Sequence, residues 1–135
     1  MKQWAGALLV TKENKLILQK RDDKPGIFNS GMITLFGGGV EPGENIREAA
    51  LREIKEEVDV TVLDNQLLTL ASYQKNIREH GDDCLCHVFI VKNVNPKSIT
   101  VLEGEGYVLV DNHTPLSEDM YSHVTIRAIK DYYKM

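Results

Sequence analysis

Three glutamates near the middle of the chain have a spacing that gathers side chains on one face of a helix. At about 100° per residue, Glu53, Glu56 and Glu57 fall within an arc of roughly 100°. Like charges at this spacing destabilise a helix by a few tenths of a kcal/mol per pair, so a compensating cation is expected. Mg²⁺ takes oxygen ligands, and the adjacent Arg52 can hold one carboxylate as an ion pair. The alternative is an acidic helix face that is only solvated.

A glycine-rich segment precedes this helix. Gly37, Gly38 and Gly39 are consecutive, and Glu44 follows shortly before the helix begins. Glycines let the backbone approach a ligand closely, and their amides can bind phosphate oxygens. We therefore consider the three glycines as substrate-binding residues, with an ordinary turn as the alternative.

Together these residues resemble the Nudix box, G-x5-E-x7-R-E-U-x-E-E-x-G-U, in which U is aliphatic. The match runs from Gly38 to Val60 and agrees at eight of the nine specified positions. The exception is Asp59, which stands where the family has its last glycine. That position follows a helix, where a left-handed residue is common, and Asp tolerates this conformation better than most residues. We expect a modest stability cost there and no loss of a metal ligand.

The resemblance implies an α+β Nudix fold, an α/β/α sandwich with a mixed central sheet. It also implies hydrolysis of a nucleoside diphosphate linked to another group X, with Mg²⁺ or Mn²⁺ as cofactor. By position, Glu53, Glu56 and Glu57 are the metal ligands and Gly38 contributes its backbone carbonyl. Arg52 then orients a glutamate, and the box glutamate that precedes the helix has a supporting part near the metal.

Two further residues outside the box are candidates by the same resemblance. Many family members place another glutamate, a metal ligand or general base, in a loop before a late strand. Glu103 fits this place better than Glu105, although a solvated loop acid is the alternative for either. Arg21 ends a strand that leads toward the glycines and is a candidate phosphate ligand, with an exposed strand-end charge as the alternative.

Other chemically capable side chains receive structural interpretations. Trp4 is interpreted as a packed aromatic rather than a base-stacking one. On an alternating strand, His87 faces away from Cys84 and Cys86, which favours ordinary strand packing over a soft-metal cluster.

The substrate class follows from markers that the segment after the box lacks. Many ADP-ribose hydrolases have a proline near the position of Gln74 or Lys75, and dinucleoside polyphosphate hydrolases tend to have a tyrosine slightly later. Tyr73 leaves the second class open. The remaining hypothesis is a nucleoside triphosphate, standard or damaged, converted to nucleoside monophosphate and pyrophosphate. The alternatives are a hydrolase of ADP-sugars or dinucleoside polyphosphates, and a non-catalytic nucleotide- or sugar-nucleotide-sensing module; such modules usually lose box glutamates that this chain keeps.

The elements that must position these residues can also be predicted. Asn45 is a plausible N-cap for the helix, with Glu48 completing a capping-box pattern. Strands are expected at Trp4–Thr11, Leu16–Lys20, Met32–Phe36, Val60–Leu63, Leu67–Gln74, Leu85–Lys92 and Tyr107–Val110, with a polar connection at Arg78–Asp83. Helices are expected at about Ile46–Val58 and from about Ser117 to Tyr133.

The whole chain of 135 residues is the size of one domain, so residues 1–135 are interpreted as a single Nudix hydrolase domain. Its net charge of −4 disfavours a nucleic-acid coat protein. No apolar run approaches the roughly 20 residues that span a bilayer, and the first residues do not resemble a signal peptide. The expected partner is a small nucleotide and the expected location is cytoplasmic. A homodimer is an option, since family members are often dimers.

Overall fold

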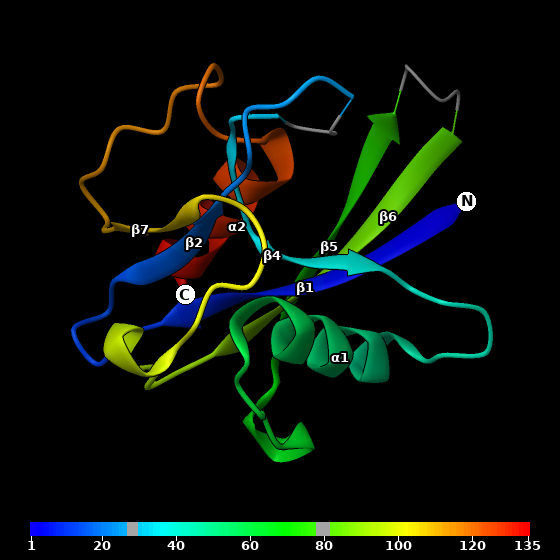
Figure 1. Cartoon of the computed structure of the whole chain (residues 1–135), viewed down its shortest axis with the longest axis horizontal. Helices are drawn as coiled ribbons and strands as arrows, with labels where there is room; N and C mark the ends of the chain where they lie inside the picture. The colour runs from blue at the N-terminus through cyan, green and yellow to red at the C-terminus, as the bar shows by residue number, and fades with distance from the viewer. Residues whose placement is uncertain (27–29, 78–81) are drawn as a thin grey trace.

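The computed structural model describes residues 1–26, 30–77 and 82–135. Seven strands of this described part form one mixed sheet, in which β3, β2, β1, β6 and β5 follow one another and β4 and β7 pair with β1 and β2 (Figure 1). The strands are β1 (Lys2–Val10), β2 (Leu16–Lys20), β3 (Ile33–Thr34), β4 (Phe36–Gly39), β5 (Leu68–Ile77), β6 (Asp82–Val91) and β7 (Gly106–Val110).

The centre of the sheet is the parallel pair β1 and β6, in which Trp4 stands opposite Cys86. All other pairs are antiparallel. Because β6 takes one edge of β1, β4 and β2 share the other edge: β4 pairs with residues 4–7 of β1 and β2 with its last two residues. On this side of β1 the sheet therefore splits into two branches, one that begins with β4 and one that begins with β2.

In the described part of the chain, two α-helices cover the sheet, α1 (Ile46–Val58) and α2 (His123–Lys134). Alternate side chains of β1 pack into two separate apolar clusters: Ala7 and Leu9 join the cluster under α1, and Leu8 joins the one under α2. The helices therefore lie on opposite faces, which confirms the expected α/β/α arrangement with a mixed sheet (Figure 1). Among the described residues, no helix is long and apolar enough to cross a membrane.

Both ends of α1 follow from local sequence signals. At the start, the Asn45 side chain accepts a hydrogen bond from the Glu48 amide at 2.8 Å, as predicted for the N-cap. The side-chain amide nitrogen of Asn45 in turn donates to the Glu48 carboxylate at 2.7 Å. The second hydrogen bond of this cap therefore comes from the Asn45 side chain, whereas in a capping box it comes from the N-cap backbone amide. At the end, Asp59 has φ 54° and ψ 39°, the left-handed conformation predicted for it. Its carboxylate also pairs with Lys55 at 2.9 Å.

Several predicted elements differ from the structure. The expected strand Val60–Leu63 is wrong: the segment is irregular and leads into a 3₁₀ turn at Asp64–Gln66. Only Val62 of this segment is buried, whereas Leu63 is 60% exposed, so the segment cannot bury one full face as a sheet strand does.

The expected strand Met32–Phe36 is split into β3 and β4 at Leu35. The Leu35 amide donates to the Thr125 hydroxyl of α2 at 3.1 Å rather than to a neighbouring strand. The last helix begins at His123, later than Ser117, because Ser122 is its N-cap. Of the polar connection expected at Arg78–Asp83, residues 78–81 lie outside the described residues, and β6 has already begun at Asp82.

Candidate functional site

The glycines of β4 and the glutamates of α1 are in direct contact. A Cβ at Gly38 would overlap the Glu53 carboxylate, so only glycine allows this approach. The Gly37 amide donates to the Glu57 carboxylate at 3.3 Å. Two of the predicted glycines therefore hold carboxylates close to the backbone.

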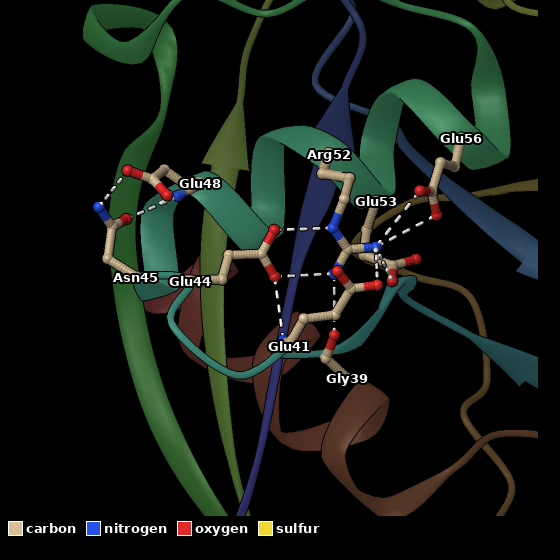
Figure 2. A network of polar contacts seen from close by, with 8 residues as sticks. All are labelled: Gly39, Glu41, Glu44, Asn45, Glu48, Arg52, Glu53 and Glu56. Atoms are coloured by element: carbon tan, nitrogen blue, oxygen red, sulfur yellow. Dashed lines mark hydrogen bonds and ion pairs between the residues drawn. The ribbon is translucent and has the colours of Figure 1, made fainter.

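Arg52 joins the surrounding carboxylates into one network. Figure 2 shows its guanidinium between Glu44 on one side and Glu53 and Glu56 on the other. It forms a bidentate pair with Glu44, at 2.7 and 2.9 Å, and its other terminal nitrogen lies 2.9 Å from Glu53 and 3.2 Å from Glu56. It also donates to the Gly39 carbonyl at 3.0 Å. One cation thus fixes the position of three carboxylates.

The hydrogen bonds from Arg52 lower the pKa of Glu44 to about 2, and Glu44 in turn raises the pKa of Arg52. Glu44 is therefore ionised throughout the neutral range, which keeps the bidentate pair intact. This is more than the supporting part expected for Glu44, because the pair fixes the guanidinium that reaches the α1 carboxylates.

The inner carboxylates are in a different environment. Glu57 is only 3% exposed, and burial raises its pKa to about 9, with the charges of Glu53 and Glu103 adding to the shift. Burial also raises the pKa of Glu53, and Arg52 acts against this shift. Acidic groups are therefore crowded into a poorly hydrated space beside α1.

This space is one end of a cavity of about 440 Å³. The acidic end is lined by Glu53, Glu56, Glu57 and Glu103, together with Gly37 and Gly38. The rest of the lining includes Trp4, Arg21, Thr34, Lys75, Cys84 and Cys86, together with residues at the start of α2. The structure thus brings seven predicted site residues to one cavity. It leaves Gly39, Arg52 and Glu105 outside the lining.

The loop that carries Glu103 is anchored at both ends. The Leu102 amide donates to the Glu57 carbonyl at 2.7 Å, which attaches the loop to the last turn of α1. The buried Gln19 side chain donates to the Glu103 carbonyl at 3.2 Å. Gly104 has φ +82°, and a Cβ there would lie 2.5 Å from the Lys20 carbonyl. These contacts hold Glu103 at the cavity.

Arg21 lies where the sequence places it, directly after β2, with its amide bound to the Met32 carbonyl at 3.0 Å. Its buried Nε has no hydrogen-bond partner among the described residues. Arg21 is thus a cation on the cavity wall with an unused donor.

The lining also contains residues that the sequence did not indicate as functional. Gln19, which holds the Glu103 loop but does not line the cavity, is a polar residue inside an apolar strand, and this was a usable signal. Thr34, Lys75 and the two cysteines come from separate strands and gave no local signal.

The structural interpretations of the remaining side chains fit their positions. His87 lies between Ser72 and Gln3, at 2.9 and 2.6 Å, and does not line the cavity, whereas Cys84 and Cys86 do. The two cysteines are buried and free, with their Sγ atoms 4.0 Å apart.

Trp4 packs on glycine backbone, as expected for a packed aromatic. A Cβ at Gly6 or Gly37 would overlap its indole ring, so the ring rests directly on β1 and β4. The same ring lines the cavity, which the sequence did not predict.

The donor set at the acidic end suits a hard divalent cation, because all side-chain donors there are carboxylates. Among the described residues, no three His, Cys, Asp or Glu side chains are already grouped closely enough to hold a metal by themselves. Arg52 holds both Glu53 and Glu56 at hydrogen-bond distance. Because Mg²⁺ needs only one or two protein carboxylates beside waters and phosphate oxygens, the residues present still fit it.

Comparison with known proteins identifies the family. A family model for the NUDIX domain matches residues 1–122. The chain belongs to the NUDIX domain family. This confirms the resemblance read from the box and supports the expectation of a Nudix-type hydrolase.

Individual relatives are more distant. The nucleoside triphosphatase NudI of Escherichia coli O1:K1 is 46% identical over 55 residues, which are 41% of this chain and 38% of that protein. The chain thus matches well under half of the length of this curated relative. The MutT protein of Methanosarcina mazei Go1 has the same fold, with a TM-score of 0.80, 19% identity, and coverage of 98% of this chain and 94% of that one. The dihydroneopterin triphosphate pyrophosphohydrolase of E. coli superposes with a TM-score of 0.75 at 21% identity, covering 96% and 93%.

Proposed function

We propose that this NUDIX domain is a metal-dependent pyrophosphohydrolase that converts a nucleoside triphosphate to nucleoside monophosphate and pyrophosphate. The observation that carries the proposal is the meeting of three α1 carboxylates and Glu103 at one end of a single cavity. The cavity volume lies within the range of small-molecule sites. The names of the NudI relative and of the E. coli structural neighbour, both of which act on triphosphates, support the same substrate class.

The residues of this chain have distinct roles in the proposed reaction. Arg21, with its unused donor, binds a phosphate oxygen and orients the chain of phosphates along the cavity. Glu103 accepts a proton from water as the water oxygen forms a bond to the α-phosphorus. The bond from that phosphorus to the α–β bridging oxygen breaks, and pyrophosphate leaves with its electron pair. Phosphoryl transfer depends mainly on such positioning and on stabilisation of charge.

Glu53, Glu56 and Glu57, with the carbonyl of Gly38, would hold Mg²⁺ or Mn²⁺. When bound, the metal neutralises the charge that develops on the phosphate oxygens. Arg52 holds Glu53 and Glu56 ready at the cavity edge, and Glu57 is fixed by the Gly37 amide.

The test is pyrophosphate and phosphate release from a substrate panel with Mg²⁺, Mn²⁺ or EDTA. The panel holds standard and oxidised nucleoside triphosphates, ADP-ribose, sugar nucleotides and dinucleoside polyphosphates. We expect metal-dependent release of pyrophosphate from triphosphates, lowered by several orders of magnitude in Glu56→Gln and Glu57→Gln, with Glu105→Gln as the matched control.

Each alternative predicts a different result in the same assay. Turnover of ADP-ribose or dinucleoside polyphosphates alone would show that these compounds, and not nucleoside triphosphates, are the substrates. Ligand-induced stabilisation without turnover of any compound would indicate a binding module. Full activity in the folded Glu56→Gln and Glu57→Gln variants would refute the metal-site assignment.

A further inference from the structure

The end of the cavity opposite the carboxylates is a compartment to which four strands contribute described residues. Lys75 on β5 stands opposite Cys84 on β6, and Cys86 stands opposite Trp4 on β1. Alternation places these four side chains on the face of the sheet that α2 covers, where all four line the cavity. Thr34 on β3 also lines the cavity. It can therefore receive a group that projects from phosphates held at the acidic end.

Thr34 is the residue that indicates a missing polar partner. Its side chain lines the cavity and the residue is only 7% exposed, yet its hydroxyl has no hydrogen-bond partner among the described residues. Buried hydroxyl groups are nearly always hydrogen-bonded, because an unpaired one costs free energy. The neighbouring hydroxyls of Ser122 and Thr125 differ, since they bind each other at 2.7 Å, and that of Ser122 also caps α2. A bound ligand would satisfy Thr34.

The other groups of this compartment mainly donate hydrogen bonds. An ammonium group such as that of Lys75 donates and cannot accept, and a thiol is a weak donor. Burial, together with the neighbouring Cys84, raises the pKa of the Cys86 thiol to about 12, so the thiol keeps its proton at neutral pH. Burial lowers the pKa of Lys75, and the two thiols act against this shift.

Strong acceptors are confined to the opposite end. Of the side chains described as lining the cavity, every carboxylate belongs to α1 or is Glu103, and none is an Asn or Gln. A carbonyl oxygen on a ligand would therefore find donors in the compartment. An amino group in the same place would find the Thr34 hydroxyl as its main side-chain acceptor, beside the donor Lys75.

We propose that Thr34, Lys75 and the Cys84–Cys86 pair form a base-specificity pocket, which selects nucleobases with an exocyclic oxygen over those with an exocyclic amine at the same position. The inference rests on the proposed function, because it assumes that a nucleotide places its phosphates at the acidic end. It adds that the preferred substrates are oxo-bases such as uracil and hypoxanthine.

Matched substrate pairs test this selectivity. UTP differs from CTP, and ITP from ATP, by an oxo group in place of an amino group and by an N–H in place of the adjacent unprotonated ring nitrogen. We expect kcat/KM to favour UTP over CTP and ITP over ATP by about tenfold or more, the discrimination typical of a site that leaves polar groups unpaired with the wrong ligand. Equal kcat/KM values within both pairs would overturn the inference.

Two variants connect the selectivity to these residues. Thr34→Val keeps the branched shape and removes an unpaired hydroxyl, so the variant should fold with an unchanged or higher Tm. Lys75→Met should raise KM for the oxo member of a pair and reduce the discrimination severalfold, with kcat retained. Thr34→Val should raise KM for both members of a pair, because the hydroxyl can donate to an oxo group and accept from an amino group. The exposed Thr69→Val and Lys97→Met are the matched controls. Discrimination that survives Lys75→Met, or KM values that are unchanged in Thr34→Val, would overturn the assignment.

Binding of non-hydrolysable analogues separates this inference from the proposed function. If no nucleotide is hydrolysed, the proposed reaction fails, but Kd values for the α,β-methylene analogues of UTP and CTP still test the pocket. Tighter binding of the UTP analogue, with the preference lost in Lys75→Met, would support the pocket. Equal or undetectable binding of both analogues would refute it.

Discussion

Glu103 and Glu105 are neighbouring acids on one loop with different surroundings. Glu103 lines the cavity and its charge acts on Glu57, whereas Glu105 is outside the lining and its amide binds the Lys20 carbonyl at 2.8 Å. We predict that Glu103→Gln lowers kcat by about 10²–10⁴-fold, the usual contribution of a general base. Glu105→Gln should leave kcat unchanged. Steady-state kinetics with melting curves for both variants check this, and equal effects would contradict the role given to Glu103.

Asp59, the one residue that departs from the box, is expected to lower the stability of the fold slightly. Its left-handed backbone favours glycine, while its exposed pair with Lys55 contributes only about 0.3–0.5 kcal/mol. Asp59→Gly should therefore be tolerated, and should raise the free energy of unfolding slightly, by up to about 1 kcal/mol. Urea unfolding at neutral pH measures the change. A clear loss of stability would mean that the Asp59 carboxylate has a further role.

At the level of elements, the loop carrying Glu103 depends on β2. Gln19 donates to the Glu103 carbonyl, while its own side-chain oxygen is buried without a partner among the described residues. Gln19→Met removes both the hydrogen bond to the Glu103 carbonyl and the buried, unpaired side-chain oxygen, so we expect little change in Tm. We expect kcat to fall severalfold with KM unchanged, because Glu103 is held less firmly. The exposed Gln74→Met is the control, and wild-type kcat in Gln19→Met would exclude this positioning role.

The elements also show which predictions local sequence can support. The limits of α1 were predictable because Asn45 and Asp59 act through bonds within one helical turn. The strand expected at Val60–Leu63 failed because apolar, β-branched residues predict a strand only where a sheet edge is available. Leu35 illustrates the same limit, since the residue that interrupts its strand, Thr125, lies 90 positions away in the sequence.

For the whole molecule, the acidic half of the cavity was predictable and the other half was not. Glu53, Glu56 and Glu57 occupy one helix, so their proximity follows from helical geometry. Thr34 and Lys75 meet across the cavity only because β3 and β5 belong to the same divided sheet. The spacing of these two residues along the sequence does not predict that they line the same cavity.

Crowded carboxylates beside a packed core couple the candidate metal site to the stability of the whole molecule. In EDTA, Glu57→Gln should be as stable as the wild type or more so, because it replaces a carboxyl whose ionisation burial and the nearby Glu53 and Glu103 disfavour, and it keeps an acceptor for the Gly37 amide. A bound ligand at about 100 times its Kd adds about 2.7 kcal/mol of stability, so Mg²⁺ should raise the Tm of the wild type by several degrees. It should raise the Tm of Glu105→Gln equally and that of Glu57→Gln much less. Melting curves with and without Mg²⁺ check this, and an equal gain in all three proteins would place the cation elsewhere.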